Sequence, residues 1–182
     1  VEFLSTPPTP AEDVIQSITV TGSIEPLTVI DIDVPVQTTF LIDASRNFKS
    51  AEFSIKNNTP VPVSVTATSL KAKENNPTKV VAHTAYSDIE WNNLNQSDTQ
   101  SQIALGIQII EDKSDLLESP PADTQWFGDE NTDSNILLGT LPSAYSTKQP
   151  PQLTLQFDSR YGMSWGDVSS IEYDLTLTFS AA

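Results

Sequence analysis

Apolar and polar residues alternate with a period of two along much of the chain, which is the pattern of a half-buried β-strand. The stretch near the C-terminus shows it most clearly, because Tyr173, Leu175, Leu177 and Phe179 share one face and polar residues share the other. Similar stretches recur along the chain, separated by clusters of turn-forming residues. They predict strands at residues 18–23, 29–34, 38–42, 52–56, 61–66, 80–81, 103–110, 136–138, 153–157 and 171–179.

Many short alternating strands joined by loops predict an all-β fold, an antiparallel β-sandwich of jelly-roll-like type. The strand at 171–179 is expected in the core with one face in water. Residues 57–60, Asn-Asn-Thr-Pro, are expected to join their flanking strands as a hairpin, and Pro62 indicates an edge strand. Weak helical periodicity is confined to residues 87–94 and 112–117, and the acidic, proline-containing stretch 114–134 is expected to be a loop.

Residues 1–13 differ in character from the rest, so we divide the chain into an extended N-terminal arm at 1–13 and a β-sandwich domain at 14–182. The arm begins with a short apolar patch of Val1, Phe3 and Leu4, and three prolines follow it. Prolines disfavour helices and central strands and favour an extended polyproline arrangement. The arm is therefore either a frayed terminus or a spacer that carries an apolar tip to another surface.

The net charge of the chain limits the classes of partner that it is expected to bind. The 182 residues include 9 basic and 24 acidic side chains, which gives a net charge of -15. A field of that sign repels phosphate backbones, so we expect no nucleic-acid partner. No stretch has the ~18 apolar residues that a membrane span needs, so we expect no membrane insertion. The chain has no cysteine, and it starts with Val1, so that either a signal peptide was removed or the sequence was shortened at its start. These features fit an exported protein, and we expect an extracellular or cell-surface location.

No catalytic constellation stands out, and we expect the protein not to be an enzyme. A Ser-His-Asp system would have to use His83, the single histidine. Neither a Gly-x-Ser-x-Gly elbow nor a His-Glu-x-x-His motif is present. On a strand, a lone histidine is usually a surface or packed polar residue.

One acidic loop is the best candidate for a cation site. Asp129, Glu130 and Asp133 follow Trp126-Phe127-Gly128, and calcium is bound by clustered carboxylates from flexible loops. The spacing is not that of an EF-hand. A Ca²⁺ site and a solvated acidic loop are both compatible with these residues, and no other cofactor is expected.

The three tryptophans fall in or near predicted loops. If Trp91, Trp126 and Trp165 are exposed, they suit stacking against sugars in a binding module. If they are buried, they close the ends of the sandwich core.

Several strand-like motifs resemble those of secreted β-sandwich surface proteins of Firmicutes. They include Ile18-Thr19-Val20-Thr21-Gly22-Ser23, Phe53-Ser54-Ile55-Lys56-Asn57-Asn58 and Tyr173-Asp174-Leu175-Thr176-Leu177-Thr178-Phe179. The terminal strand is similar to that of WxL-type wall-associated proteins but has no Trp-x-Leu. The Ile-Lys-Asn-Asn segment is similar in style to the camelysin and TasA matrix-fibre proteins. That resemblance implies jelly-roll subunits that join by donating an N-terminal strand to the next subunit.

The arm gives a physical reason to expect assembly. Edge strands of a sandwich carry unpaired backbone groups, and an extended segment from a neighbour can satisfy them. Such a head-to-tail contact propagates as a filament. We therefore expect a structural subunit of an extracellular fibre or surface assembly, a homopolymer in which Val1, Phe3 and Leu4 insert into the adjacent subunit. The alternative is a surface module that binds a glycan, a receptor or another surface protein through the tryptophan-bearing loops.

Overall fold

The computed structural model describes residues 13–24, 29–110, 115–131 and 133–182. Within them the chain forms eleven strands, two short α-helices and one 3-10 turn. The strands are β1 (Ile32–Asp33), β2 (Phe40–Ile42), β3 (Phe48–Ser50), β4 (Phe53–Asn57), β5 (Val63–Ala72), β6 (Lys79–Val80), β7 (Gln102–Ile109), β8 (Thr124–Trp126), β9 (Ile136–Leu141), β10 (Gln152–Arg160) and β11 (Tyr173–Ala181). The helical segments are η1 (His83–Ala85), α1 (Asp88–Asn92) and α2 (Gln96–Ser101).

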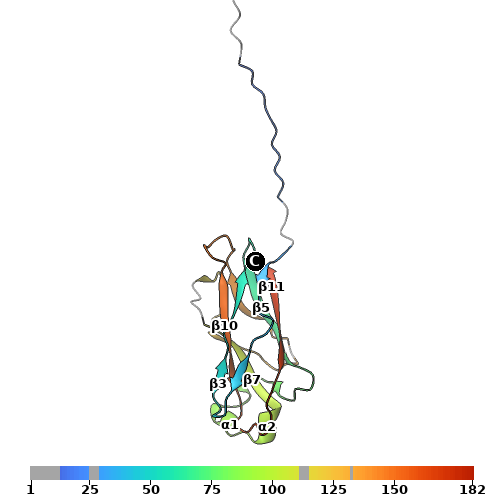
Figure 1. The fold of residues 1–182 in the computed structure, drawn as a ribbon, viewed down its shortest axis with the longest axis vertical. Coiled ribbons are helices and arrows are strands. Elements are labelled where there is room, and N and C mark those ends of the chain that lie inside the picture. The colour runs from blue at the N-terminus through green and yellow to red at the C-terminus, as the bar shows by residue number, and fades with distance from the viewer. Residues whose placement is uncertain (1–12, 25–28, 111–114, 132) are drawn as a thin grey trace, which may run out of the picture.

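The strands form two main sheets that pack face to face, which confirms the predicted antiparallel β-sandwich. The larger sheet has the order β1-β4-β10-β7-β6, with β8 also paired to β7. The smaller sheet has the order β11-β5-β9, and β2 and β3 form a separate hairpin. All pairings are antiparallel except that of β6 with β7. The helices α1 and α2 lie at the end of the sandwich opposite the C-terminus (Figure 1).

Alternating apolar side chains from both sheets fill the space between them. The larger sheet contributes Ile55, Leu105, Ile107 and Leu155, and the smaller sheet contributes Val65 and Leu138, all without exposed surface. Strand β7 is buried on both faces along most of its length. Its Gly106 lies so close to Trp126 of β8 that a Cβ there would be 3.0 Å from the ring. The glycine therefore permits β8 to pair closely with the centre of β7.

Two details of the predicted connections are wrong. Residues 57–60 do not close a hairpin, because β4 belongs to the larger sheet and β5 to the smaller one. The buried side chain of Asn57 instead donates to the carbonyl oxygens of Val61 and Pro142, so it holds the crossing between the sheets. Pro62 does not mark an edge strand, since β5 begins after it and is the central strand of its sheet.

The helix predicted at residues 87–94 is confirmed as α1. Its start has a complete capping box, in which Ser87 accepts from the backbone of Glu90 and the Glu90 carboxylate accepts from the backbone of Ser87. The second predicted helical stretch, 112–117, lies partly outside the described residues. No helix of the described chain is long and apolar enough to cross a membrane.

Candidate functional site

An open groove lined by both apolar and polar residues runs along one side of the sandwich. It has a volume of about 950 Å³. One wall is the inward face of β11 and the residues just before it, and the other wall is the chain from Val34 to Ile42. Core side chains line it as well, among them Phe53, Leu70, Leu105, Phe157 and Trp165. The groove therefore reaches into the hydrophobic core of the molecule.

The groove exists because β11 is an edge strand. In the described chain β11 pairs with β5 only, and the strand on the far side of the groove is β2 of the β2–β3 hairpin. The prediction that residues 171–179 form a core strand with one wet face is therefore only partly right. Its apolar residues Tyr173, Leu175, Leu177 and Phe179 do face inward, but each is only half-buried.

Two buried polar atoms belong to residues that line this groove. Among the described residues, the Thr38 hydroxyl and the Trp165 indole N–H are the buried side-chain polar atoms that have no hydrogen-bond partner. Buried polar groups in folded proteins nearly always have a partner, and an exception calls for an explanation. Both atoms are buried beneath the surface of the groove, so neither is open to solvent in it.

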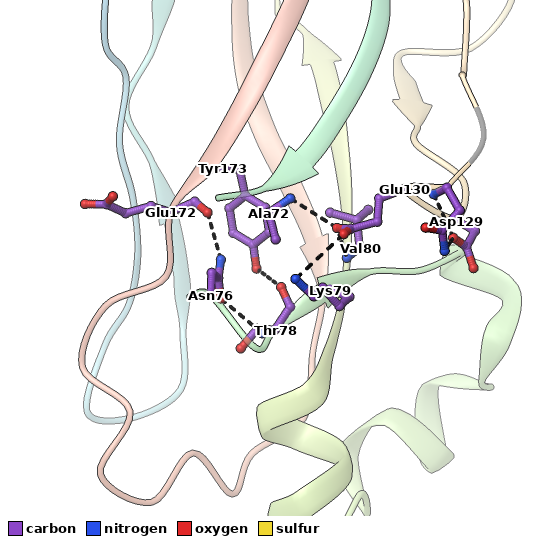
Figure 2. A network of polar contacts seen from close by, with 10 residues as sticks. Ala72, Asn76, Thr78, Lys79, Val80, Asp129, Glu130, Glu172 and Tyr173 are labelled. Atoms are coloured by element: carbon purple, nitrogen blue, oxygen red, sulfur yellow. Dashed lines mark hydrogen bonds and ion pairs between the residues drawn. The ribbon is translucent and has the colours of Figure 1, made fainter. Parts of the chain in front are cut away.

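A polar network anchors the end of β11 that borders the groove (Figure 2). The Tyr173 hydroxyl donates to the carbonyl of Thr78 at 2.7 Å, and the Asn76 amide donates to the carbonyl of Glu172 at 2.8 Å. The Asn76 side chain also accepts the backbone N–H of Thr78. Burial of Tyr173, together with the nearby Glu130 charge, raises the pKa of its phenol well above its usual 10.0. These contacts within the chain hold this wall of the groove in place.

The N-terminal segment 13–24 lies outside both sheets. The strand predicted at 18–23 is absent from the sandwich, and residues 13–24 run as an extended trace away from its strands (Figure 1). Its apolar side chains Val14, Ile18, Val20 and Ile24 are between 84% and 97% exposed. Isolated exposed apolar residues are common, but a whole strand-like row of them indicates an unmet contact. The predicted arm residues Val1, Phe3 and Leu4 lie outside the described residues.

The tryptophans do not form a shared surface. Trp91 and Trp165 are buried, with 2% and 5% of their surface exposed, and the Trp91 indole donates to the carbonyl of His83. Only Trp126 is half-exposed. Its ring stacks with His83 at 4.7 Å between centroids, and the Arg160 guanidinium lies 5.3 Å from the ring centre. The protein's own side chains therefore cover much of the one accessible indole.

The acidic loop has a structural role in this arrangement. One oxygen of Glu130 accepts the backbone N–H groups of both Ala72 and Val80 at 3.1 Å, and its other oxygen lies 4.0 Å from the Lys79 ammonium (Figure 2). Asp129 accepts from Asn131, and Asp133 is exposed. In the part of the chain that the structure describes, no three His, Cys, Asp or Glu side chains converge as a metal site requires. The Ca²⁺ hypothesis gains no support from this geometry.

The chain matches no protein-family model, no curated protein and no solved structure. The resemblance to fibre and wall-associated proteins therefore stays a prediction.

Sequence reasoning identified β11 and its apolar face but missed the groove beside it. A sequence shows which face of a strand is apolar, and it does not show whether that strand has a neighbour on each side. The sequence did contain one sign of an unfilled site. Residues 14–24 have the alternation of a strand, yet they pair with no strand of the described chain.

Proposed function

We propose that this protein is a structural subunit of an extracellular fibre or surface assembly, in which the N-terminal region of one copy docks on the sandwich of the next. The observation that carries the proposal is the open groove beside the unpaired edge of β11. An exposed edge strand with an apolar face is a ready site for an added strand, and soluble proteins usually protect such edges. Here the edge is left open and lies next to core side chains.

The N-terminal region supplies the complementary half. Residues 13–24, the described part of this region, contribute to neither sheet, so they can reach a neighbour without unfolding the domain. A subunit with a donor at one place and an acceptor at another makes a head-to-tail contact, and repetition of that contact produces a filament. The proposed activity is assembly and not catalysis, and the proposed partner is the same chain.

The alternative, a binding module that uses tryptophan-bearing loops, has less support. It needs exposed aromatic faces, and two of the three tryptophan rings are buried. The half-exposed Trp126 remains the one indole that such a module could offer to a glycan, beside His83 and Arg160.

Electron microscopy and sedimentation of the full chain test the proposal against a chain that lacks residues 1–24. We expect concentration-dependent filaments from the full chain. We expect folded monomers from the shortened one, because residues 13–24 take no part in the sheets of the domain. Monodisperse full-length particles at all concentrations would reject the proposed function, and so would filaments from the shortened chain.

A further inference from the structure

We propose that the donated element is the segment 14–24, and that it binds as an added strand along the free edge of β11 in a second copy of the chain. This rests on the proposed function and replaces the apolar tip at residues 1–4 as the inserted element. The three-stranded sheet β11-β5-β9 would thereby gain a fourth strand, and the groove would be filled.

The side-chain pattern of the segment fits this position. In an added strand every second side chain points into the groove. Val14, Ile18, Val20 and Ile24 are in the same phase, together with Gln16 and Gly22, whereas the opposite phase is mostly Ser and Thr. Apart from Gln16 on the first face and Ile15 on the second, one face of the segment is therefore apolar and the other polar, as along β11 itself.

The length of the segment also fits. Strand β11 has 9 residues and spans roughly 30 Å at the usual rise per residue. An extended segment of the length of 14–24 spans roughly 36 Å by the same measure. The segment is thus long enough to pair with β11 from one end to the other.

The charge distribution favours a second copy as the occupant. The molecule carries a net charge of -15, but residues 14–24 contain no charged side chain, and neither does the opposite wall from Val34 to Ile42. The groove itself is lined by two basic and two acidic residues, Arg46, Lys73, Glu172 and Asp174. The uncharged segment of a second copy can therefore enter it without placing a carboxylate against these acidic residues. Asp13 lies just outside the segment, where solvent can reach it.

The polar residues that line the groove favour a peptide strand as the occupant. Gln37, Thr39, Ser169 and Ser170 line it together with its apolar residues. A strand brings backbone carbonyl and N–H groups into the groove along with its apolar side chains. A peptide strand therefore suits the site better than a lipid or another purely apolar ligand.

Charge substitutions on the two faces of the segment test the inference in the full chain. Ile18→Asp and Val20→Asp place a carboxylate in the groove, whereas Thr19→Asp adds the same charge on the opposite face. Because these residues are exposed in the single chain, none of the three variants should alter its fold. We expect the critical concentration for assembly to rise at least about tenfold for the first two and to change little for Thr19→Asp.

Disulfide cross-linking tests whether β11 accepts the segment 14–24 and whether that β11 belongs to a second copy of the chain. The chain has no cysteine, so single substitutions can be paired without interference. Val20→Cys protein is mixed with Leu175→Cys, Leu177→Cys or Phe179→Cys protein, and oxidised dimers are sought. Thr178→Cys is the control, because its side chain is on the outward face of β11. We expect a disulfide-linked dimer with at least one inward partner and none with the control.

The outcomes separate the inference from the proposed function. If the full chain forms filaments but Ile18→Asp, Val20→Asp and Thr19→Asp behave alike, the inference is wrong while the proposed function stands. If a chain with both Val20→Cys and an inward cysteine forms only intramolecular disulfides, the segment folds onto its own groove and the second copy is excluded. If the unaltered chain never assembles, both fail.

Discussion

The hydroxyl of Tyr173 donates a 2.7 Å hydrogen bond to the main-chain carbonyl of Thr78, and so joins the first residue of β11 to the loop between β5 and β6. This contact holds the proposed acceptor strand at the point where it enters the smaller sheet. Tyr173 also lines the groove. The same residue therefore contributes to the stability of the domain and to the shape of the docking surface.

Replacing this phenol by a phenyl ring should weaken the domain without changing its fold. Tyr173→Phe removes one buried hydrogen bond, and we expect a loss of about 1 kcal/mol in the free energy of unfolding. For a chain of this size that is a fall of roughly 2–4 °C in Tm. Urea titration and thermal scanning measure both values. Tyr145→Phe is the matched control, since that side chain is 82% exposed, and an equal loss there would contradict the explanation.

Stability should also decline in alkaline solution. Burial raises the pKa of Tyr173, so above pH 10 the unfolded chain loses the phenolic proton while the folded chain retains it. The stabilising contribution is thus complete below pH 10 and is lost as the pH rises, at up to about 1.4 kcal/mol per pH unit. Unfolding midpoints between pH 9 and pH 11 should fall less steeply for Tyr173→Phe than for the unaltered protein. Parallel curves would exclude Tyr173 as the titrating group.

The strands that sequence reasoning found are those whose alternation is long and regular. β5, β7, β10 and β11 were all predicted, because each buries one face or both and its apolar residues repeat accordingly. β3 and β8 were missed, since each has three residues and lies among turn-forming residues and not in an apolar run as β1, β2 and β6 do. The stretch 114–134 was predicted to be a loop, and β8 lies within it, so that prediction is partly wrong. The three-residue β8 depends on its close approach to Gly106, a contact between residues distant in the sequence.

The other errors concern the partner of a segment and not its strand-like pattern. Residues 18–23 have the pattern of a strand, and the structure leaves them unpaired; Asn57 and Thr59 have the composition of a hairpin turn, and they cross between sheets. The alternation of apolar and polar residues predicts that one face of a strand is buried. It does not predict which sheet, or which molecule, that strand joins. For the same reason, the sequence indicated Glu130 as a cation ligand and did not show that its carboxylate links β5 to β6.

Loss of the Glu130 carboxylate, whose side chain is only 13% exposed, should be more damaging than its place in a loop suggests. Its oxygen accepts from Ala72 at the end of β5 and from Val80 in β6, so it joins the smaller sheet to the larger one. Glu130→Ala leaves both N–H groups without their acceptor and should cost about 2–4 kcal/mol in unfolding experiments. Glu130→Gln keeps an oxygen acceptor and loses only a weak pairing with Lys79, so about 1 kcal/mol or less is expected.

The neighbouring Asp133 provides the control for that comparison. It is exposed in the same loop, and Asp133→Ala should change the free energy of unfolding by no more than about 0.5 kcal/mol. If Glu130→Gln proves as destabilising as Glu130→Ala, then the charge and not the pair of backbone contacts is what stabilises the loop.

The Thr38 hydroxyl should be dispensable in the monomer. It is buried without a partner among the described residues, so Thr38→Val removes an unsatisfied group and keeps the shape of the side chain. We expect monomer stability to be unchanged or up to about 1 kcal/mol higher. Thr59→Val is the contrast, because the buried Thr59 hydroxyl accepts from the backbone N–H of Asp31 and donates to the carbonyl of the same residue. That variant should lose about 1–3 kcal/mol, and equal results for the two would show that the Thr38 hydroxyl already has a partner.

Assembly should accelerate with salt. Each copy carries a net charge of -15, so copies repel one another across the solvent at low ionic strength. The range of that repulsion falls from roughly 30 Å at 0.01 M salt to about 8 Å at 0.15 M. The proposed contact has no charged side chain on the donor segment, so salt removes repulsion there and weakens no attraction. Light scattering should show assembly at least about tenfold faster in 0.15 M than in 0.01 M sodium chloride. Ile18→Asp should remain monomeric at either concentration, and assembly that slows with salt would mean that ion pairs, and not the apolar face of residues 14–24, hold the copies together.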